Sequence, residues 1–442
     1  MYLNKTCIYI FMENKLKSAL SGGVFTFFID MFDIYLPIIV LAPALAYFEP
    51  SNLKPVYLFA LTYATLAATL LGRPIGTVLF GNYADKKGRK SATQKSVIMA
   101  SVFTFLILIL PGYSLLGLVS ISLLLVFRFF VGIFLGGMYT GASPLAMEYS
   151  PKSKRGVYGA ILNIGYPFAF AAISLISLPL LFEFPATSST STYEVWIWRI
   201  PFAIETILLV ILYIYYRKIV PESEIWEESK KVKSPISEIL FGSQSKQFWQ
   251  VFILMTGFWF GLLTIVSSIG SISESFVKIS ATTYLLYISI SAIIGGFLLI
   301  PWGMLSQKIG RKKVLVIGGL LFIIGVPFFY AFINYGKGWG LIGVFFAILL
   351  LWIISDIGFS GTVTAYITER FKTSTRSSGF GMGYTWGVLI PSFNSFFIIG
   401  LSYVMPAKYA ETLPLLFIGG VLVIAGALLG PETKDVDFDK NA

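Results

Sequence analysis

The sequence contains no histidine and only one cysteine, Cys7, among its 442 residues. A single cysteine cannot form a disulfide within the chain or a cysteine metal cluster. The absence of histidine removes the commonest metal ligand and the side chain whose unperturbed pKa lies nearest neutrality. We therefore predict no metal site and no cofactor, and we expect any proton transfer by side chains to use carboxylates.

Charged residues are also scarce, at 12% of the chain, whereas a soluble protein of this length carries about 25%. Hydrophobic residues make up 56%, and the mean hydropathy is +0.80. Apolar runs of about 20 residues, the length that crosses a bilayer, recur along the chain. A soluble core would require a dozen such helices without polar faces. The sequence therefore predicts an all-α polytopic membrane protein embedded in the lipid bilayer.

We expect twelve transmembrane helices, with ends uncertain by about four residues. They fall into an N-terminal group within 1–217 and a C-terminal group within 248–442, joined by a charged linker at 218–247 with one or two amphipathic turns on the membrane. The expected spans are 22–46, 57–80, 93–111, 114–141, 157–182, 198–218, 248–273, 281–303, 314–334, 340–367, 379–403 and 412–430.

The basic residues predict the orientation of these spans, because short cytoplasmic loops retain lysine and arginine. With both termini cytoplasmic, 26 of the 33 basic residues fall on the cytoplasmic side and 4 on the outer side. We therefore expect a multi-pass protein of the plasma membrane. The net charge of +11 is explained by this topology and by anionic lipid head groups, so it does not indicate nucleic acid.

A short basic loop occurs twice in the chain. Gly81–Lys90 reads GNYADKKGRK, and Gly303–Lys312, 222 residues later, reads GMLSQKIGRK. Glycine, lysine and arginine positions coincide in the two copies, and each copy lies between apolar segments. Such an echo at half the chain length indicates two related halves.

Longer motifs surround these loops. The second span ends GRPIGTVLFGNYADKKGRK, and RFFVGIFLGGMYTGASPLAMEYSPKSKRG follows at Arg128–Gly156. WRIPF begins at Trp198. After the tenth expected span, the chain repeats the motif spacing of a glutamate, an aromatic residue, an arginine and a glycine, here at Glu369, Phe371, Arg376 and Gly379. Together these motifs resemble the major facilitator superfamily, and within it the metabolite:proton symporter branch. PES at Pro221 and PETK at Pro431 resemble the sugar-porter branch instead.

The resemblance implies the major facilitator fold, two pseudo-symmetric six-helix bundles that rock about a site near the midplane. We expect a monomeric secondary transporter that binds a small-molecule substrate and protons and takes its energy from the proton gradient. We do not expect an enzyme, because the sequence has no histidine, no nucleotide-binding loop and no extramembrane domain.

The repeated loops are candidates for a cytoplasmic gate. Asp85 is expected to pair with a neighbouring arginine and with the N-terminal dipole of the helix that begins near Ser377–Gly379. Its counterpart Gln307 lacks the charge, which predicts an asymmetric gate. Alternatively, the charges of these loops only set the topology. The candidate gating residues are Gly81, Asp85, Lys86, Gly88, Arg89, Arg73, Glu148, Arg155, Gly303, Gly310, Arg311, Glu369 and Arg376.

Seven ionisable residues lie inside the expected spans, and each costs about 3 kcal/mol to insert unless it is paired or faces water. They are Asp30, Asp33, Arg73, Arg128, Arg199, Glu205 and Asp356.

Asp33 and Arg128 should meet at similar depth, with Asp30 one turn earlier on the same face as Asp33. The resemblance implies that an acid of this stretch carries the proton, with Arg128 as counter-ion. A static buried salt bridge is the alternative. We assign Arg73 to the loop latch and Glu205 to a polar contact between helices.

The central cavity is expected to use Arg128, Asn163, Asp356, Tyr35, Trp259, Tyr384 and Trp386 for the substrate. We expect a small organic acid, whose carboxylate Arg128 could hold. A sugar is the close alternative: PES and PETK favour it, but Asn163 alone in span 5 and the lack of glutamine in span 7 do not. An exporter of apolar compounds and a transport-silent receptor are further alternatives.

Overall fold

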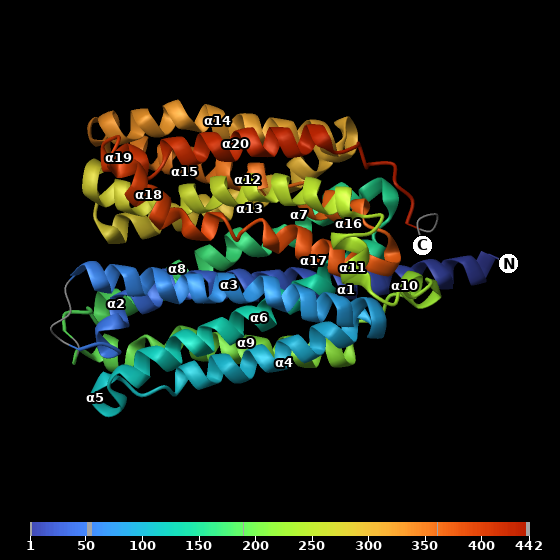
Figure 1. Ribbon diagram of the computed structural model, residues 1–442, viewed down its shortest axis with the longest axis horizontal. Coiled ribbons are helices and arrows are strands. Elements are labelled where there is room, and N and C mark those ends of the chain that lie inside the picture. Colours follow the sequence, from blue (N-terminus) through green and yellow to red (C-terminus); the bar gives the residue numbers. More distant parts are fainter. Residues whose placement is uncertain (1, 51–54, 189, 360, 439–442) are drawn as a thin grey trace.

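The structure is a computed structural model that describes residues 2–50, 55–188, 190–359 and 361–438. These described residues form helices and no strands. Figure 1 shows the helices running roughly side by side, with most of those before the linker in the lower part and most of those after it in the upper part, while α7 (Arg155–Asn163) lies beside α13 (Ala281–Ile309) and α16 (Val363–Arg370).

The first half contains nine α-helices, of which several join end to end to cross the bundle. Their bounds are α1 Tyr2–Tyr35, α2 Ala42–Ala44, α3 Pro55–Lys87, α4 Arg89–Leu108, α5 Tyr113–Leu116, α6 Leu118–Tyr149, α7 Arg155–Asn163, α8 Gly165–Glu183 and α9 Arg199–Lys218.

The linker forms two short helices and the second half forms nine. Their bounds are α10 Glu224–Glu228, α11 Pro235–Leu240, α12 Ser245–Ile272, α13 Ala281–Ile309, α14 Arg311–Tyr335, α15 Gly340–Phe359, α16 Val363–Arg370, α17 Arg376–Trp386, α18 Asn394–Ser402, α19 Ala407–Ala410 and α20 Leu413–Leu429.

The expected membrane spans correspond to these helices. Among the described residues, eleven helical segments are long and apolar enough to cross a membrane, and a further apolar helix, Gly340–Asp356, is shorter. Three spans differ from the expectation in that they are interrupted: the fifth, which divides into α7 and α8 at Ile164, and the tenth and eleventh. The tenth divides into α15 and α16, and the eleventh divides into α17 and α18 around a short 3₁₀ turn at Pro391–Phe393. Proline explains the break in the eleventh span, since it has no N–H to continue the helical ladder.

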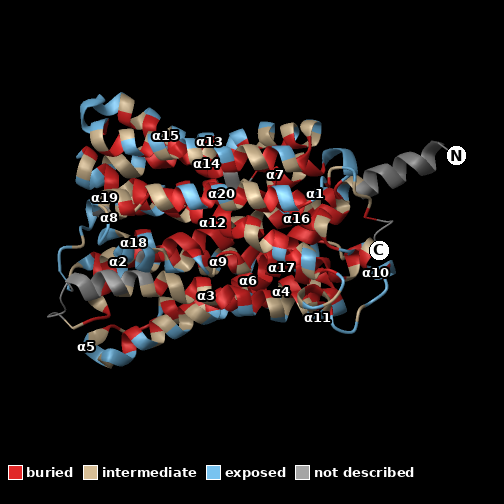
Figure 2. Cartoon of the chain, turned by 45° about the horizontal axis from the view of Figure 1, so that its top comes forward, coloured by how far each residue is buried: buried red, intermediate tan, exposed pale blue. Residues whose placement is uncertain are grey.

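Glycine permits close approach between helices of the first half. A β-carbon on Gly132 would lie 2.1 Å from the Thr69 carbonyl oxygen, and one on Gly76 would lie 1.8 Å from that of Ile133. Helices α3 and α6 therefore pack backbone against backbone, as small residues allow in membrane proteins. Figure 2 shows the resulting burial, with buried residues concentrated on the helices in the middle of the bundle.

Both chain ends and the linker helices lie at one end of the bundle, on the right in Figure 1. We call this the linker end. At this end Gly88 (φ 110°) joins α3 to α4, and Gly310 (φ 108°) joins α13 to α14. Only glycine adopts such backbone angles without strain. The two copies of the repeated loop therefore make the same turn.

The linker helices cover this end. The indole of Trp226, in α10, donates to the Asp85 carbonyl oxygen at 2.9 Å, and α11 contacts α12, α17 and α3. The expected short turns are present, but they contact the helix ends of the bundle.

Candidate functional site

The linker end is closed by contacts between the two halves, and Asp85 makes the most direct one. Its carboxylate, near the end of α3, accepts the backbone N–H groups of Ser377 at 3.0 Å and Ser378 at 2.8 Å, at the start of α17. A β-carbon on Gly81 would lie 2.8 Å from the Ser378 α-carbon, so only glycine allows this approach. The predicted contact of Asp85 with a helix N-terminus is therefore present.

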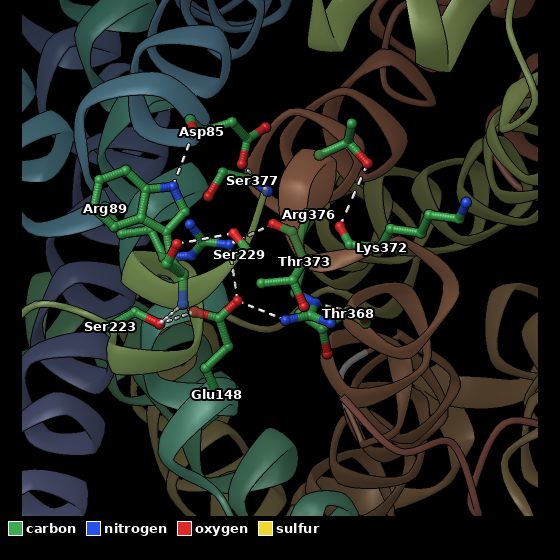
Figure 3. Close-up of polar contacts among 12 residues, drawn as sticks. Asp85, Arg89, Glu148, Ser223, Ser229, Thr368, Lys372, Thr373, Arg376 and Ser377 are labelled. Carbon is green, nitrogen blue, oxygen red and sulfur yellow. Dashed lines mark hydrogen bonds and ion pairs between the residues drawn. The ribbon is translucent and has the colours of Figure 1, made fainter. Parts of the chain in front are cut away.

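The neighbouring arginine, Arg89, interacts electrostatically with Asp85 as expected, but its hydrogen bonds are made to a different acid. Arg89 donates to Glu148 Oε1 at 2.8 Å and to the Thr373 carbonyl oxygen at 2.9 Å. Arg376 donates to the same Glu148 oxygen at 2.6 Å. Figure 3 shows Glu148 between these two arginines. Helices α4 and α6 of the first half are thus joined to α17 of the second by buried charged hydrogen bonds.

The second half repeats this arrangement. Arg311 pairs with Glu369, with its Nη2 at 3.2 Å from Oε1. Gln307, the counterpart of Asp85, accepts the Gly156 N–H at 3.1 Å, at the start of α7. A β-carbon on Gly303 would lie 2.5 Å from the Gly156 carbonyl oxygen. The pseudo-symmetry read from the repeated loops therefore extends to these contacts.

Two glutamates of the PES and PETK motifs cap the helices that follow the repeated loops. Glu222 accepts the N–H groups of Arg89 and Lys90 at 3.0 and 3.1 Å. Glu432 accepts those of Arg311 and Lys312 at 2.8 and 3.1 Å. This capping role of the PES and PETK motifs was not predicted from the sequence, where they indicated only a family resemblance.

The environments of these glutamates differ. Burial raises the pKa of the Glu222 carboxyl above its ordinary value, although backbone N–H groups oppose this. Burial also acts to raise the pKa of Glu432, but the donated backbone N–H groups outweigh it and hold that pKa below the ordinary value.

The C-terminal segment adds a contact that the sequence gave no reason to expect. The Phe438 ring is 1% exposed and lies between two guanidinium groups. The Arg155 group is 3.5 Å from its centroid and the Arg376 group 3.8 Å. Because these arginines belong to different halves, the ring lies across the junction. Of the predicted gating residues, Lys86 alone is exposed at the end of α3.

Two arginine–aspartate pairs lie inside the membrane-spanning part of the first half. Arg128 on α6 donates from Nη2 to Asp33 Oδ2 at 3.0 Å and from Nη1 to Oδ1. Arg73 on α3 pairs with Asp30 at 2.9 Å. All four side chains are at most 2% exposed. Asp33 and Arg128 meet as expected.

The assignment of Arg73 to the loop latch was wrong, because its guanidinium lies on Asp30 one turn before Asp33. Each aspartate therefore has its own arginine, so Arg128 does not serve both. Glu205, on α9, is fully buried and interacts electrostatically with both Asp33 and Arg128. It is thus a third ionisable side chain at this pair.

A cavity of about 520 Å³ extends from mid-depth toward the end opposite the linker. It is lined from both halves, by α1 and α3 on one side and by α12, α13 and the start of α18 on the other. The outer part of the cavity is lined by three exposed residues, Ser267, Ser271 and Ala281. The structure is therefore hollow at this end and closed at the linker end.

Some of the predicted substrate residues line the cavity and others do not. Tyr35 and Trp259 line the cavity. Tyr384 borders Trp259, whose indole donates to its carbonyl oxygen at 2.9 Å. Trp386 packs on Phe248, with ring centroids 5.6 Å apart. These last two side chains are not part of the lining.

The polar residues expected in the cavity lie elsewhere. Asn163 joins the halves through Thr364 at 3.0 Å. Arg128 is occupied by Asp33, and Asp356 is fully buried beside Gly295. None of the three lines the cavity.

The polar lining residues that were not predicted from the sequence include Glu274, Tyr284 and Asn394. Asn394 lies just after the break in the eleventh span, and its side-chain oxygen and nitrogen are both buried without a partner among the described residues. The proline before it, Pro391, was the available signal, because broken helices often line transporter sites.

Comparisons with known proteins agree with this architecture. A model of the Major Facilitator Superfamily matches residues 23–394. The chain is 30% identical over 384 residues to the inner membrane metabolite transport protein YhjE of Escherichia coli (strain K12), covering 84% of each protein. It is 26% identical over 449 residues to the proline/betaine transporter of the same organism, covering 97% of this chain and 85% of that protein.

Among solved structures, the proton:xylose symporter XylE bound to 6-bromo-6-deoxy-D-glucose superposes with a TM-score of 0.74 and 18% identity, covering 97% of this chain and 98% of XylE. This likeness shows the shared fold. Together with the family match over most of the chain, it shows that the protein is not an enzyme and that it belongs to the Major Facilitator Superfamily of membrane transporters.

Proposed function

We propose that the protein is a proton-coupled symporter of a small polar metabolite that works by alternating access. In this proposal the halves 1–217 and 248–442 rock against each other about the linker 218–247. The linker end faces the cytoplasm, the protein acts as a monomer in the plasma membrane, and the proton gradient supplies the energy without a cofactor.

The observation that carries the proposal is the buried pair of Asp33 and Arg128. A charged pair at this depth is expensive unless it has a structural or transport role. The neighbouring carboxyl of Glu205 makes the pair more than a simple bridge, because a second acid competes with Asp33 for the arginine. A proton on Asp33 would therefore leave Glu205 as the acid available to Arg128.

The position of Asp33 connects this exchange to the cavity. It lies on α1 between Met31 and Ile34, which line the cavity, and its own side chain faces α6. Protonation of Asp33 weakens the bond between α1 and α6 beside the cavity wall. Proton occupancy and solute occupancy then act on the same helix, which is the requirement for coupling.

The lining of the cavity favours a zwitterionic or neutral polar solute over an organic anion. Glu274 is the one charged residue in the described lining, which contains no lysine or arginine. The earlier expectation of an organic acid depended on Arg128, which does not reach the cavity in this conformation. A carboxylate alone would therefore lack a cationic partner.

Aromatic and amide groups complete the proposed binding site. Tyr35, Trp259 and Tyr284 can bind a cationic ammonium group by cation–π contact, next to the charge of Glu274. The unpartnered Asn394 amide can bind a carboxylate or hydroxyl group. The relative named as a proline/betaine transporter is consistent with such a solute.

Thermal-shift measurements on purified protein test the solute class, with glycine betaine, L-proline, D-xylose and succinate as probes. We expect stabilisation by one of the first three, and a smaller shift with Asn394→Ala. Stabilisation by succinate alone would contradict this assignment and restore the organic acid.

Uptake into proteoliposomes then tests the proton assignment with the stabilising probe. Asp33→Asn keeps the shape of the side chain but cannot cycle a proton, so we expect binding to persist and accumulation driven by a pH gradient to fall at least tenfold. Glu183→Gln, at an exposed acid at the end of α8, is the matched control. Undiminished accumulation by Asp33→Asn would show that Asp33 does not carry the proton.

A further inference from the structure

Asp356 is a buried acid that the proposed mechanism does not use. It lies on α15, in the second half, and its side chain is fully buried. Its carboxylate makes no ion pair among the described residues, and the Trp352 side chain is the hydrogen-bonding group that interacts with it. By contrast, Asp30 and Asp33 in the first half each have an arginine. Asp356 therefore lacks the arginine partner that Asp30 and Asp33 have.

The surroundings of Asp356 are apolar or neutral. A β-carbon on Gly295, in α13, would lie 2.4 Å from Asp356 Oδ2, so the glycine makes room for the carboxyl group. The Trp352 ring lies one turn away on the same helix and also crowds Gly295. The titratable groups that interact with Asp356 are the hydroxyls of Tyr35 and Tyr166, and no described lysine or arginine does so.

Aromatic rings connect this acid to the cavity across the junction of the halves. Tyr35, from α1, lines the cavity and lies 6.2 Å from Tyr166 of α8. The Tyr166 ring stacks on Trp352 at 5.7 Å with an interplanar angle of 9°. The hydroxyls of Tyr35 and Tyr166 interact with each other, and each interacts electrostatically with Asp356, so they connect the cavity to this acid.

On the other side of Asp356, the halves meet through contacts that alternating access must break. Gly296 lies against Pro167 and Phe168 of α8, and Gly303 lies against Gly156 of α7. Helix α13 runs from Gly295 through these contacts to the linker end. Separation of α13 from α7 and α8 at that end would admit water to the level of Asp356.

An unpaired ionised carboxylate at this depth would cost several kcal/mol. The protonated, neutral carboxyl group avoids this cost. Once water enters, it can solvate the carboxylate, so the free-energy cost of ionisation falls. We propose that Asp356 is a second proton-carrying site, protonated while the linker end is closed and deprotonated when that end opens. The O–H bond breaks heterolytically, the proton passes to water at the linker end, and the carboxylate takes up a proton from the cavity side after closure.

This inference rests on the alternating access of the proposed function but not on Asp33 as a proton carrier. Both sites would move protons in the same direction, so the protein would carry up to two protons per cycle. The two assignments can fail separately, because the Asp33 experiment measures accumulation of solute, whereas the Asp356 experiment measures the protonation of the Asp356 carboxyl group.

Infrared difference spectroscopy of the full-length protein in liposomes, between acidic and alkaline pH, provides that test. We expect a protonated-carboxyl C=O band that is lost in Asp356→Asn and retained in Asp33→Asn and in the exposed control Glu183→Gln. Labelling with dicyclohexylcarbodiimide, which reacts with protonated carboxyls in apolar surroundings, gives a second readout by mass spectrometry of the Asp356 peptide.

A further experiment tests whether the protonation of Asp356 changes with the conformation of the protein. In a variant that opens the linker end, Asp85→Asn, we expect at least a fivefold fall in carbodiimide labelling of Asp356 at the same pH. If Asp356 is unlabelled and its band is absent in the wild type, the acid is not protonated in the closed state and the proposal fails. Equal labelling in both conformations would also overturn it, because the proton would then not be exchanged.

Discussion

Asp85 accepts two backbone N–H groups from the other half, those of Ser377 and Ser378, whereas Gln307 in the equivalent position accepts one, from Gly156. The first contact places a charge at the N-terminus of α17, and the second places a neutral amide at the N-terminus of α7. Because a charge interacts more strongly with a helix dipole than an amide does, the two pseudo-symmetric contacts contribute unequally to closure of the linker end.

Asp85→Asn should therefore weaken closure more than a change at Gln307. Loss of a charged contact of about 1–2 kcal/mol corresponds to a shift of roughly 5–30-fold in the ratio of closed to open forms. The measurement is the rate of thiol labelling at Ala365→Cys in a Cys7→Ser background. Ala365 is buried and contacts Gly159 across the junction, so it should react only when the linker end opens.

The control for this prediction is Asp435→Asn, which removes an exposed acid at the same end of the molecule. It should label at the wild-type rate. An unchanged labelling rate in Asp85→Asn would mean that the carboxylate contributes only to topology, as the alternative interpretation of the loop charges holds.

Gly303→Ala should prevent the linker end from closing fully. The added β-carbon would lie 2.5 Å from the Gly156 carbonyl oxygen, and backbone atoms cannot move aside as a flexible side chain does. Labelling of Ala365→Cys should rise and transport should fall at least tenfold. Gly400→Ala, in α18, meets no atom within 4 Å and serves as the control. Equal transport by both alanine variants would show that the close approach at Gly303 is not required.

The sequence predicted the contacts that depend on motif and helix register. Asp85 was placed against the correct helix because the repeated loop and the start of the eleventh span are both recognisable. Asp33 and Arg128 were matched because each lies near the middle of its span. The agreement in these cases reflects the narrow range of depths that a membrane helix allows for a charge.

Contacts that depend on a single turn or on side-chain direction could not be predicted. An uncertainty of four residues is about 6 Å along a helix, enough to assign Arg73 to the loop when it lies on Asp30. Arg128 was expected to face the cavity, but its direction depends on how α6 is rotated against α1. Phe438 lies in a short polar tail, where no periodicity indicates which residue is buried.

Stability should depend on pH differently through the two capping glutamates. The depressed pKa of Glu432 means that its ionised form stabilises the folded state above its ordinary pKa of 4.5, and this contribution is lost as the pH falls through its lower folded value. The raised pKa of Glu222 has the opposite consequence. The contribution of this residue to the stability of the folded state is largest below pH 4.5 and falls as the pH rises.

Glu432→Gln should thus lower the melting temperature at pH 7, by an amount equivalent to about 1 kcal/mol for a lost cap, and the difference should shrink on acidification. Glu222→Gln should lower it less at pH 7, because Glu222 is more deeply buried and lacks the further backbone N–H that Lys434 donates to Glu432. Thermal unfolding of purified protein between pH 4 and 8 measures both. A larger loss for Glu222→Gln at pH 7 would contradict this assignment of the two environments.

Phe438→Ala should open the linker end by removing a ring that contacts both halves. The Arg155 and Arg376 groups lie 3.5 and 3.8 Å from the ring centroid, so each is in cation–π contact in a buried setting, worth about 1–2 kcal/mol. Labelling of Ala365→Cys should therefore rise at least fivefold. Phe438→Leu separates the two physical causes, because leucine restores apolar burial but has no ring quadrupole. If Phe438→Leu labels as slowly as the wild type, burial alone holds the tail in place. If Phe438→Ala also does so, the tail does not contribute to closure, and the contacts of Glu148 and Asp85 suffice.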